Sequence, residues 1–418
     1  MVTGIYSILT LLIVLTAAFS YINHRFIKLP ATIGVMLISL LCSLVILGVG
    51  KFYPDVLQRP AAIINSLDFE NLLMRIMLSF LLFAGAIHVD VNQLRKALVP
   101  IATYATLGVL LSTAIIGAGM YFIFPLFGIT IPFIYCLLFG ALISPTDPIA
   151  VLGILKAAKI PASIEMKISG ESLFNDGVGV VVFASILQIA KIGTENLSAG
   201  GIALLFLEEA GGGILWGLLL GYAGFYLLRS IDQYQVEVLI TLAMVMGGYL
   251  LASYLHISGP LAMVVAGIIT GNKGKALAMS DITRDYLNKF WELIDEILNA
   301  LLFILIGFEM IVLSFSGNII WLGLIAILLV LIARFVSVFL PTLLLSFRRS
   351  FERHLIPLLT WGGLRGGISV ALALSLPRGE FRDVIVSITY IIVIFSILVQ
   401  GLTIGKLAKK LTTPASTA

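Results

Sequence analysis

The sequence predicts an all-α integral membrane protein with about thirteen transmembrane helices. Three observations predict this class. Of the 418 residues, 60% are hydrophobic and only 11% are charged. The mean hydropathy is +1.11, which is typical of helical proteins that cross a bilayer several times. Apolar runs of about 20 residues, the length that spans a bilayer, recur along the chain. We therefore expect one transmembrane domain over residues 1–410 and a short cytoplasmic tail over residues 411–418.

A window of one bilayer thickness divides the chain into thirteen candidate spans. The first six spans are 4–22, 30–50, 71–89, 98–124, 132–155 and 167–192. The next seven spans are 200–228, 236–255, 257–271, 292–314, 318–346, 355–376 and 383–407. The first span is expected to be retained, because it has neither the basic leading segment nor the A-x-A site of a signal peptide. The ninth span is short, so an arrangement with twelve spans stays open.

Lysine and arginine are distributed unevenly between the two sides of these spans. Of the 26 basic residues, 18 fall in odd-numbered connections or the C-terminus, 6 fall in even-numbered connections, and Arg334 and Arg365 fall within spans. Cytoplasmic segments of membrane proteins carry the excess of basic residues. The bias therefore predicts a cytoplasmic C-terminus and, with an odd number of spans, an N-terminus outside a plasma or inner membrane.

Composition and motifs exclude several other classes of protein. The net charge of +4 is spread over many short connections, so no single basic patch for a nucleic acid is expected. An enzyme is not expected either, because the four histidines are scattered and match no HExxH or Ser/His pattern. Cys42 and Cys136 lie in apolar segments and fit no metal or redox spacing. No motif points to an organic cofactor.

Two spans are interrupted by helix-breaking residues. The fifth span contains residues 144–148 (Ser-Pro-Thr-Asp-Pro), where Pro145 and Pro148 cannot donate hydrogen bonds to earlier carbonyl groups. The twelfth span contains residues 361–367 (Trp-Gly-Gly-Leu-Arg-Gly-Gly). If the seventh span is a linker, these two spans occupy equivalent positions in two six-helix halves. Paired broken helices of this kind indicate the midplane site of a secondary transporter.

A polar run in the sixth span supplies further candidate site residues. Residues 170–176 read Gly-Glu-Ser-Leu-Phe-Asn-Asp. Helical spacing puts Ser172 and Asp176 on one stripe and Glu171 and Asn175 on the next. Ionisable groups at bilayer depth are costly and usually serve to move charge. This run and the interrupted fifth span therefore predict a small cation site lined by oxygen atoms.

The ordered set of motifs resembles the monovalent cation:proton antiporter-1 family. The matching motifs are the Thr-Asp-Pro run of the fifth span, the run 170–176 and the Gly-Leu-Arg-Gly stretch of the twelfth span. The family includes prokaryotic NhaP-type sodium/proton antiporters and animal sodium/proton exchangers. The resemblance covers nearly the whole chain. It implies inverted six-helix repeats with crossed discontinuous helices, core helices within 98–192 and 318–376, a homodimer in the lipid bilayer, and exchange of Na⁺ or Li⁺ for H⁺.

The resemblance also implies roles for individual residues around the ion. The family's central acid corresponds to Asp176, preceded by Asn175. Electrogenic relatives carry two aspartates at this pair, so Asn175 indicates electroneutral exchange of one cation for one proton. The Na⁺ ligands would be Asp147, Asp176, the Ser172 hydroxyl and the Thr146 backbone carbonyl, and such oxygen ligands suit a hard cation.

Three further positions support or modify this expected site. Glu171 resembles the family's structural acid and would pair with Arg334 of the eleventh span, as a neutralised buried pair that fixes two helices. Arg365 is expected to set the local electric field around the broken helix. Many prokaryotic relatives carry an acid after the Leu-Leu-Phe run of the third span, where this chain has Ala84. Because Ala84 cannot coordinate an ion through its side chain, the choice between Na⁺ and K⁺ stays open.

The expected mechanism is competition between Na⁺ and H⁺ for one carboxylate. Desolvation favours the protonated form of a carboxylate, and only a neutralised site crosses easily between the two sides. A K⁺/H⁺ antiporter of the same fold is the alternative, because sequence does not fix the size of the cavity. A channel is less favoured, since the two broken helices are unlike and no selectivity element repeats. A non-transporting relative is also less favoured, since every central polar group is present.

Structural roles remain as alternatives for several of these residues. The two central aspartates would then form an ion pair or a helix cap, and the hydroxyls of Ser172 and Thr146 would bond only to their own helix. The glycines of the twelfth span would form a close-packing surface. Asp295 and Glu296, near the inner end of the tenth span, either line an acidic cytoplasmic funnel or are ordinary acids near a helix N-terminus.

Overall fold

A computed structural model of the chain describes residues 5–66, 72–147, 155, 162–192, 199–313, 317–346 and 355–412. All regular secondary structure in these described ranges is helical, which confirms the predicted all-α class. Eight of the described helices are long and apolar enough to cross a membrane. Others are shorter or interrupted, so the count of thirteen spans stays a prediction.

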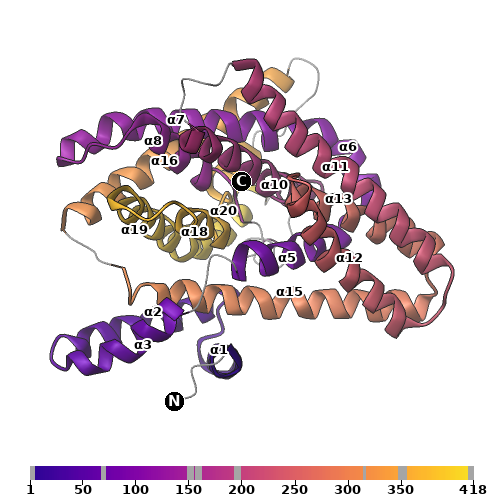
Figure 1. Cartoon of the computed structure of the whole chain (residues 1–418), viewed down its shortest axis with the longest axis horizontal. Helices are drawn as coiled ribbons and strands as arrows, with labels where there is room; N and C mark the ends of the chain where they lie inside the picture. The colour runs from indigo at the N-terminus through magenta and orange to yellow at the C-terminus, as the bar shows by residue number, and fades with distance from the viewer. Residues whose placement is uncertain are drawn as a thin grey trace, which may run out of the picture.

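The chain forms its helices in three successive groups. The first group contains α1 (Ile5–Ile22), α2 (Ala31–Gly50), α3 (Pro54–Ser66), α5 (Leu78–Ile87), α6 (Val91–Thr103), α7 (Val109–Ile123) and α8 (Phe133–Ile143). The second group contains α10 (Ala162–Ile192), α11 (Ala199–Arg229), α12 (Tyr234–Tyr254), α13 (Gly259–Ile269), α14 (Lys275–Leu277) and α15 (Asp281–Glu309). The third group contains α16 (Gly317–Ser346), α17 (Leu355–Trp361), α18 (Gly367–Leu374), α19 (Glu380–Phe395) and α20 (Gly401–Thr412). Figure 1 shows α15 as one long helix below α5 and α18, and it contacts both of them.

Helices α15 and α3 depart furthest from the sequence prediction. Helix α15 begins at Asp281, three turns before the predicted start of the tenth span at residue 292, and the Ser280 hydroxyl caps it by accepting a hydrogen bond from the Thr283 N–H at 3.4 Å. Helix α3 was not predicted, because it contains no apolar run of spanning length. It packs against the end of α2, where Leu57 lies beside Gly50.

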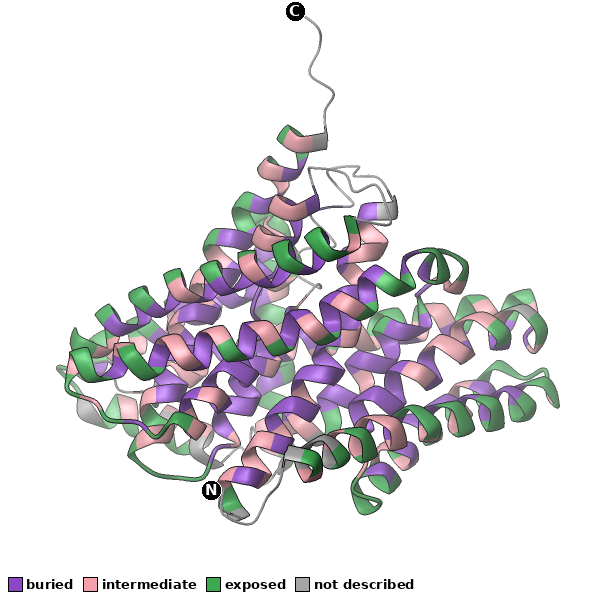
Figure 2. Cartoon of the chain, turned by 90° about the horizontal axis from the view of Figure 1, so that it is seen from above, coloured by how far each residue is buried: buried purple, intermediate pink, exposed green. Residues whose placement is uncertain are grey.

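Apolar side chains cover the outer faces of the molecule as well as its interior. Figure 2 shows buried residues along the central helices and exposed residues on the outer ones. Large apolar side chains are exposed on α1, α11, α12 and α16, among them Ile13, Leu215, Met246 and Leu328. Water-soluble monomers rarely expose so much apolar surface. These faces therefore fit contact with lipid, as a multi-pass membrane protein requires.

The two predicted interruptions lie against each other. Helix α8 ends at Ile143 and residues 145–147 are not helical, while residues 362–366 separate α17 from α18; Pro148 lies outside the described residues. The Asp147 N–H donates a hydrogen bond to the Leu364 carbonyl at 2.7 Å. Unwound backbone at membrane depth must find such partners, because lipid offers none. The crossing therefore joins the fifth and twelfth spans directly.

The connection between α13 and α15 is hydrogen-bonded to the backbone at the end of α5. The Asn272 amide accepts from the Val91 N–H at 2.9 Å and donates to the Val89 carbonyl at 2.8 Å. The Lys275 ammonium donates to the Ile87 carbonyl at 2.8 Å. Burial, together with the nearby charge of Arg284, lowers the pKa of Lys275 to about 8. These hydrogen bonds fix the segment that leads from α5 to α6.

Candidate ion-binding site

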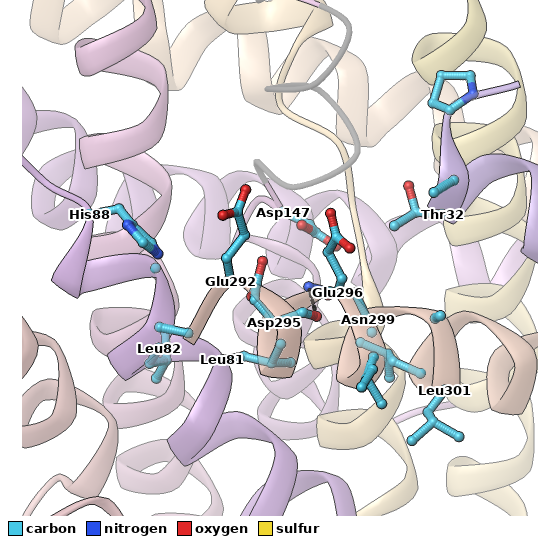
Figure 3. Close-up of a pocket in the computed structure, with 18 of the residues that line it drawn as sticks. Thr32, Leu81, Leu82, His88, Asp147, Glu292, Asp295, Glu296, Asn299 and Leu301 are labelled. Atoms are coloured by element: carbon cyan, nitrogen blue, oxygen red, sulfur yellow. Dashed lines mark hydrogen bonds between the residues drawn. The ribbon is translucent and has the colours of Figure 1, made fainter. Parts of the chain in front are cut away.

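A large cavity reaches the crossing of the broken helices. Its volume is about 1990 Å³, and both Asp147 and Asp176 line it. In Figure 3, Asp147 is seen at about the height of the Glu292 and Glu296 carboxylates, which extend upward from α15. The lining includes residues from four odd-numbered connections of the predicted topology: His24, Lys28, Asp90, Glu165 and Asn288. In the described part of the chain it includes none from the even-numbered connections, so the cavity opens toward the side with most basic residues.

Helix α10 forms hydrogen bonds with Thr146 in the unwound segment after α8. The Asn175 amide donates to the Thr146 hydroxyl at 2.8 Å and accepts from the Thr146 N–H at 3.2 Å. The Ser172 hydroxyl donates to the Thr146 carbonyl. All three residues are buried. The two paired contacts of Asn175 fix the position of the backbone next to Asp147.

Arg365 binds the end of α8 from the opposite broken helix. Its guanidinium donates to the Ser144 carbonyl and, at 2.9 Å, to the Pro145 carbonyl. These oxygens are available because the helix stops there. The Arg365 N–H donates to the Ser396 hydroxyl at 2.8 Å. Sequence identified no partner for this arginine, and the structure supplies the freed backbone oxygens of the fifth span.

Glu171 and Arg334 form a buried ion pair beside the site. Their two hydrogen bonds measure 2.5 and 3.0 Å, and the side chains are 2% and 7% exposed. Arg334 also donates through Nε to the Leu359 carbonyl at 3.1 Å. The pair therefore links α10, α16 and α17. Its charges are satisfied by each other, in the arrangement that the resemblance implied.

Of the four predicted Na⁺ ligands, Asp147 and Asp176 line the cavity. Thr146 and Ser172 lie behind this lining, and their two candidate oxygens are hydrogen-bonded to each other. Ala84 lines the facing wall on α5 and offers no oxygen. Sequence reasoning missed Asn288, Glu292 and Asn299 of α15, which also line the cavity. Their spacing along one helix face was the available signal, but part of it lay before the predicted start of the span.

Gly366 is required by close approach, because a Cβ atom there would lie 2.2 Å from Asp147 Oδ2. We expect Gly366→Ala to displace Asp147 and to lower ion exchange about tenfold or more, since small displacements at a reacting centre have large effects. Transport into proteoliposomes measures this. Gly379→Ala is the matched control, because nothing lies within 4 Å of its Cβ position. Equal rates in the two variants would contradict the prediction.

Together, the crossed broken helices and the two acids at the end of an open cavity define a secondary transporter. The family whose description is "Sodium/hydrogen exchanger, transmembrane" matches residues 12–410. The chain therefore belongs to the sodium/hydrogen exchanger family.

Similar proteins support this membership, and a solved structure has the same fold. The chain is 54% identical to the Na(+)/H(+) antiporter NhaP of Pseudomonas aeruginosa, over 96% of this chain and 95% of that protein. It is 37% identical to the Na(+)/H(+) antiporter NhaH of Halobacillus dabanensis, over 93% of each chain. The sodium proton antiporter MjNhaP1 from Methanocaldococcus jannaschii shares the fold, with a TM-score of 0.74, 20% identity and 97% coverage of both chains.

Proposed function

We propose that this protein exchanges Na⁺ for H⁺ across a membrane, with both ions competing at Asp147 and Asp176. The observation that carries this proposal is the position of the two carboxylates at the inner end of a cavity, where two unwound helices cross. The relatives named as Na(+)/H(+) antiporters support the same substrates. No separate gate for each ion is needed, because one site holds either ion but not both.

The surrounding charges fit electroneutral exchange. Asn175 uses both ends of its amide on Thr146 and carries no charge, so Asp176 is the single acid of this pair. Glu171 is neutralised by Arg334 and does not compete for the ion. Binding one Na⁺ or one H⁺ then cancels the same charge in both directions of the cycle. The homodimer stays a prediction from the resemblance.

The ligand set starts from the two carboxylates. The Thr146 carbonyl accepts the Ser172 hydrogen bond but retains a second lone pair, and the Ser172 oxygen retains its own lone pairs. Both atoms therefore remain compatible with the predicted coordination. Water in the cavity supplies the rest, since hard cations in open sites keep part of their hydration shell.

We further propose that the structure corresponds to the state open to the cytoplasm. The cavity is lined by odd-numbered connections, and these carry most of the basic residues. Basic connections mark the cytoplasmic side. In this state the carboxylates exchange ions with the cell interior.

Proteoliposomes with an acid interior and a pH-sensitive dye test the proposed function. Addition of Na⁺ or Li⁺ is expected to collapse the pH gradient, whereas K⁺ is expected to have little effect. Clamping the membrane potential with valinomycin and K⁺ is expected to leave the rate unchanged, because no net charge moves. A response to K⁺ alone would identify the K⁺/H⁺ alternative. A rate that follows the clamped potential would contradict electroneutral exchange.

A further inference from the structure

One face of α15 carries a row of oxygen-bearing side chains along the cavity. Asn288, Glu292, Asp295 and Asn299 are separated by four, three and four residues, and all of them line the cavity. On an α-helix these spacings fall on one stripe, about 16 Å long from first to last. Glu296 lies beside the stripe and also lines the cavity. Figure 3 shows Glu292, Asp295 and Glu296 on the side of α15 that faces Asp147.

At the end of this row nearest Asp147, one amide oxygen has no hydrogen-bond partner among the described residues. Asn299 is 1% exposed, and its amide nitrogen donates to the Asp295 carbonyl at 2.8 Å. Its Oδ1 atom is buried and accepts no hydrogen bond within the described residues, and the same holds for Asn288 Oδ1. Buried polar atoms are nearly always satisfied. A buried acceptor beside a carboxylate, on the wall of a cavity, is suited to a cation or its bound water.

The Asn299 end of the row reaches the candidate ion-binding site. Leu302, three residues beyond Asn299, packs against Gly367 at the start of α18, where a Cβ atom would lie 2.5 Å from its Cδ2 atom. Asp295 and Asp147 line the same cavity, and like charges repel each other when both carboxylates are ionised. Within the described residues, no ion pair neutralises Glu292, Asp295 or Glu296. A cation between Asp295 and Asp147 would relieve this repulsion.

The facing wall does not provide such a group. Helix α5 contributes Leu78, Leu81, Leu82, Ala84 and Gly85 to the cavity, and none of these residues has a side-chain oxygen. The carboxylates nearest the ion site therefore come from α15 on one side and from the broken helix and α10 on the other.

We propose that Asp295 and Asn299 form a staging site, where a monovalent cation is held before it passes to Asp147 and Asp176. This staging site rests on the proposed exchange of Na⁺ for H⁺. It adds the step in which the cation moves through the cavity toward Asp147 and Asp176. A carboxylate oxygen and an uncharged amide oxygen suit a hard cation that keeps part of its water. The staging site raises the local concentration of Na⁺ and so sets the apparent KM for this ion.

Exchange rates over a series of Na⁺ concentrations test the staging site in Asp295→Asn and Asn299→Ala. Each variant is expected to raise the apparent KM for Na⁺ about fivefold and to keep the maximal rate within about twofold, because only binding before the exchange step is lost. Asp295→Glu is expected to keep the wild-type KM. Glu309→Gln is the matched control, since Glu309 lies at the far end of the same helix and does not line the cavity.

An unchanged KM in both variants, or a lower maximal rate with an unchanged KM, would overturn the staging site. Size-exclusion profiles and melting temperatures establish that each variant is folded, and if Asp295→Asn fails to fold, Asn299→Ala decides the question. Failure of the proposed function gives a different result, because the wild-type protein would then not respond to Na⁺. A responsive wild type with variants that match it rejects the staging site alone.

Discussion

Replacing Asp176 by asparagine is expected to abolish Na⁺/H⁺ exchange while leaving the protein folded. Asparagine has nearly the same size and shape, but its amide neither ionises nor binds a proton in the relevant range. Asp176 is 6% exposed and lines the cavity with Asp147, and its neighbour Asn175 carries no charge, so the variant removes the carboxylate for which Na⁺ and H⁺ are proposed to compete. Dequenching of a pH-sensitive dye in proteoliposomes measures exchange. The Na⁺-dependent dequenching of the variant should fall to that of liposomes without protein.

Asp383→Asn provides the control for this variant. The Asp383 side chain is 75% exposed on α19, so the same chemical change there is expected to leave exchange unaltered. Normal transport by Asp176→Asn would exclude competition of Na⁺ and H⁺ at this carboxylate. The fold and family membership would stand, but the ion would have to use Asp147 without its neighbour.

Breaking the Glu171–Arg334 pair is expected to have the largest effect on stability. Removing one partner of a buried pair leaves an unpaired charge and costs about 3–5 kcal/mol. That is a large share of the about 5–15 kcal/mol by which most proteins are stable. Arg334→Met should therefore lower the melting temperature in detergent strongly, because its loss also frees the Leu359 carbonyl.

The double variant Glu171→Met/Arg334→Met separates charge from packing. Replacing a buried pair by apolar side chains of similar volume is often neutral, so the double variant should recover much of the lost stability. It should also retain Na⁺/H⁺ exchange, since neither residue is a proposed ion ligand. A single variant as stable as wild type would show that the pair does not hold α10 against α16.

The interruptions of the fifth and twelfth spans were predictable because their causes are local. Pro145 removes a backbone donor, and the glycines around Arg365 lower the helix propensity of the twelfth span. The stripe on α10 was also predictable, since helical spacing alone puts Ser172 in line with Asp176. The sequence therefore identified the crossing elements and the two acids, and the resemblance supplied the partner of Glu171.

Contacts between distant elements could not be predicted in the same way. Only the crossing reveals that Arg365 binds the Ser144 and Pro145 carbonyls, because any freed carbonyl group would have been an equal candidate. The oxygen row of α15 was missed in part, because the polar residues before 292 suggested a loop. Their helix is instead fixed by packing, as Trp291 is fully buried against Phe83 and donates to Thr241 at 3.1 Å.

The contact between Arg365 and Ser144 joins residues 221 positions apart. During synthesis, the segment after α8 is inserted long before Arg365 leaves the ribosome. The Ser144 and Pro145 carbonyls therefore lack their guanidinium donor at that stage. The binding pocket therefore cannot assemble until the segment that carries Arg365 has entered the membrane. A nascent chain that stalls before Arg365 would carry Asp147 and Asp176 but would lack the guanidinium that completes the site.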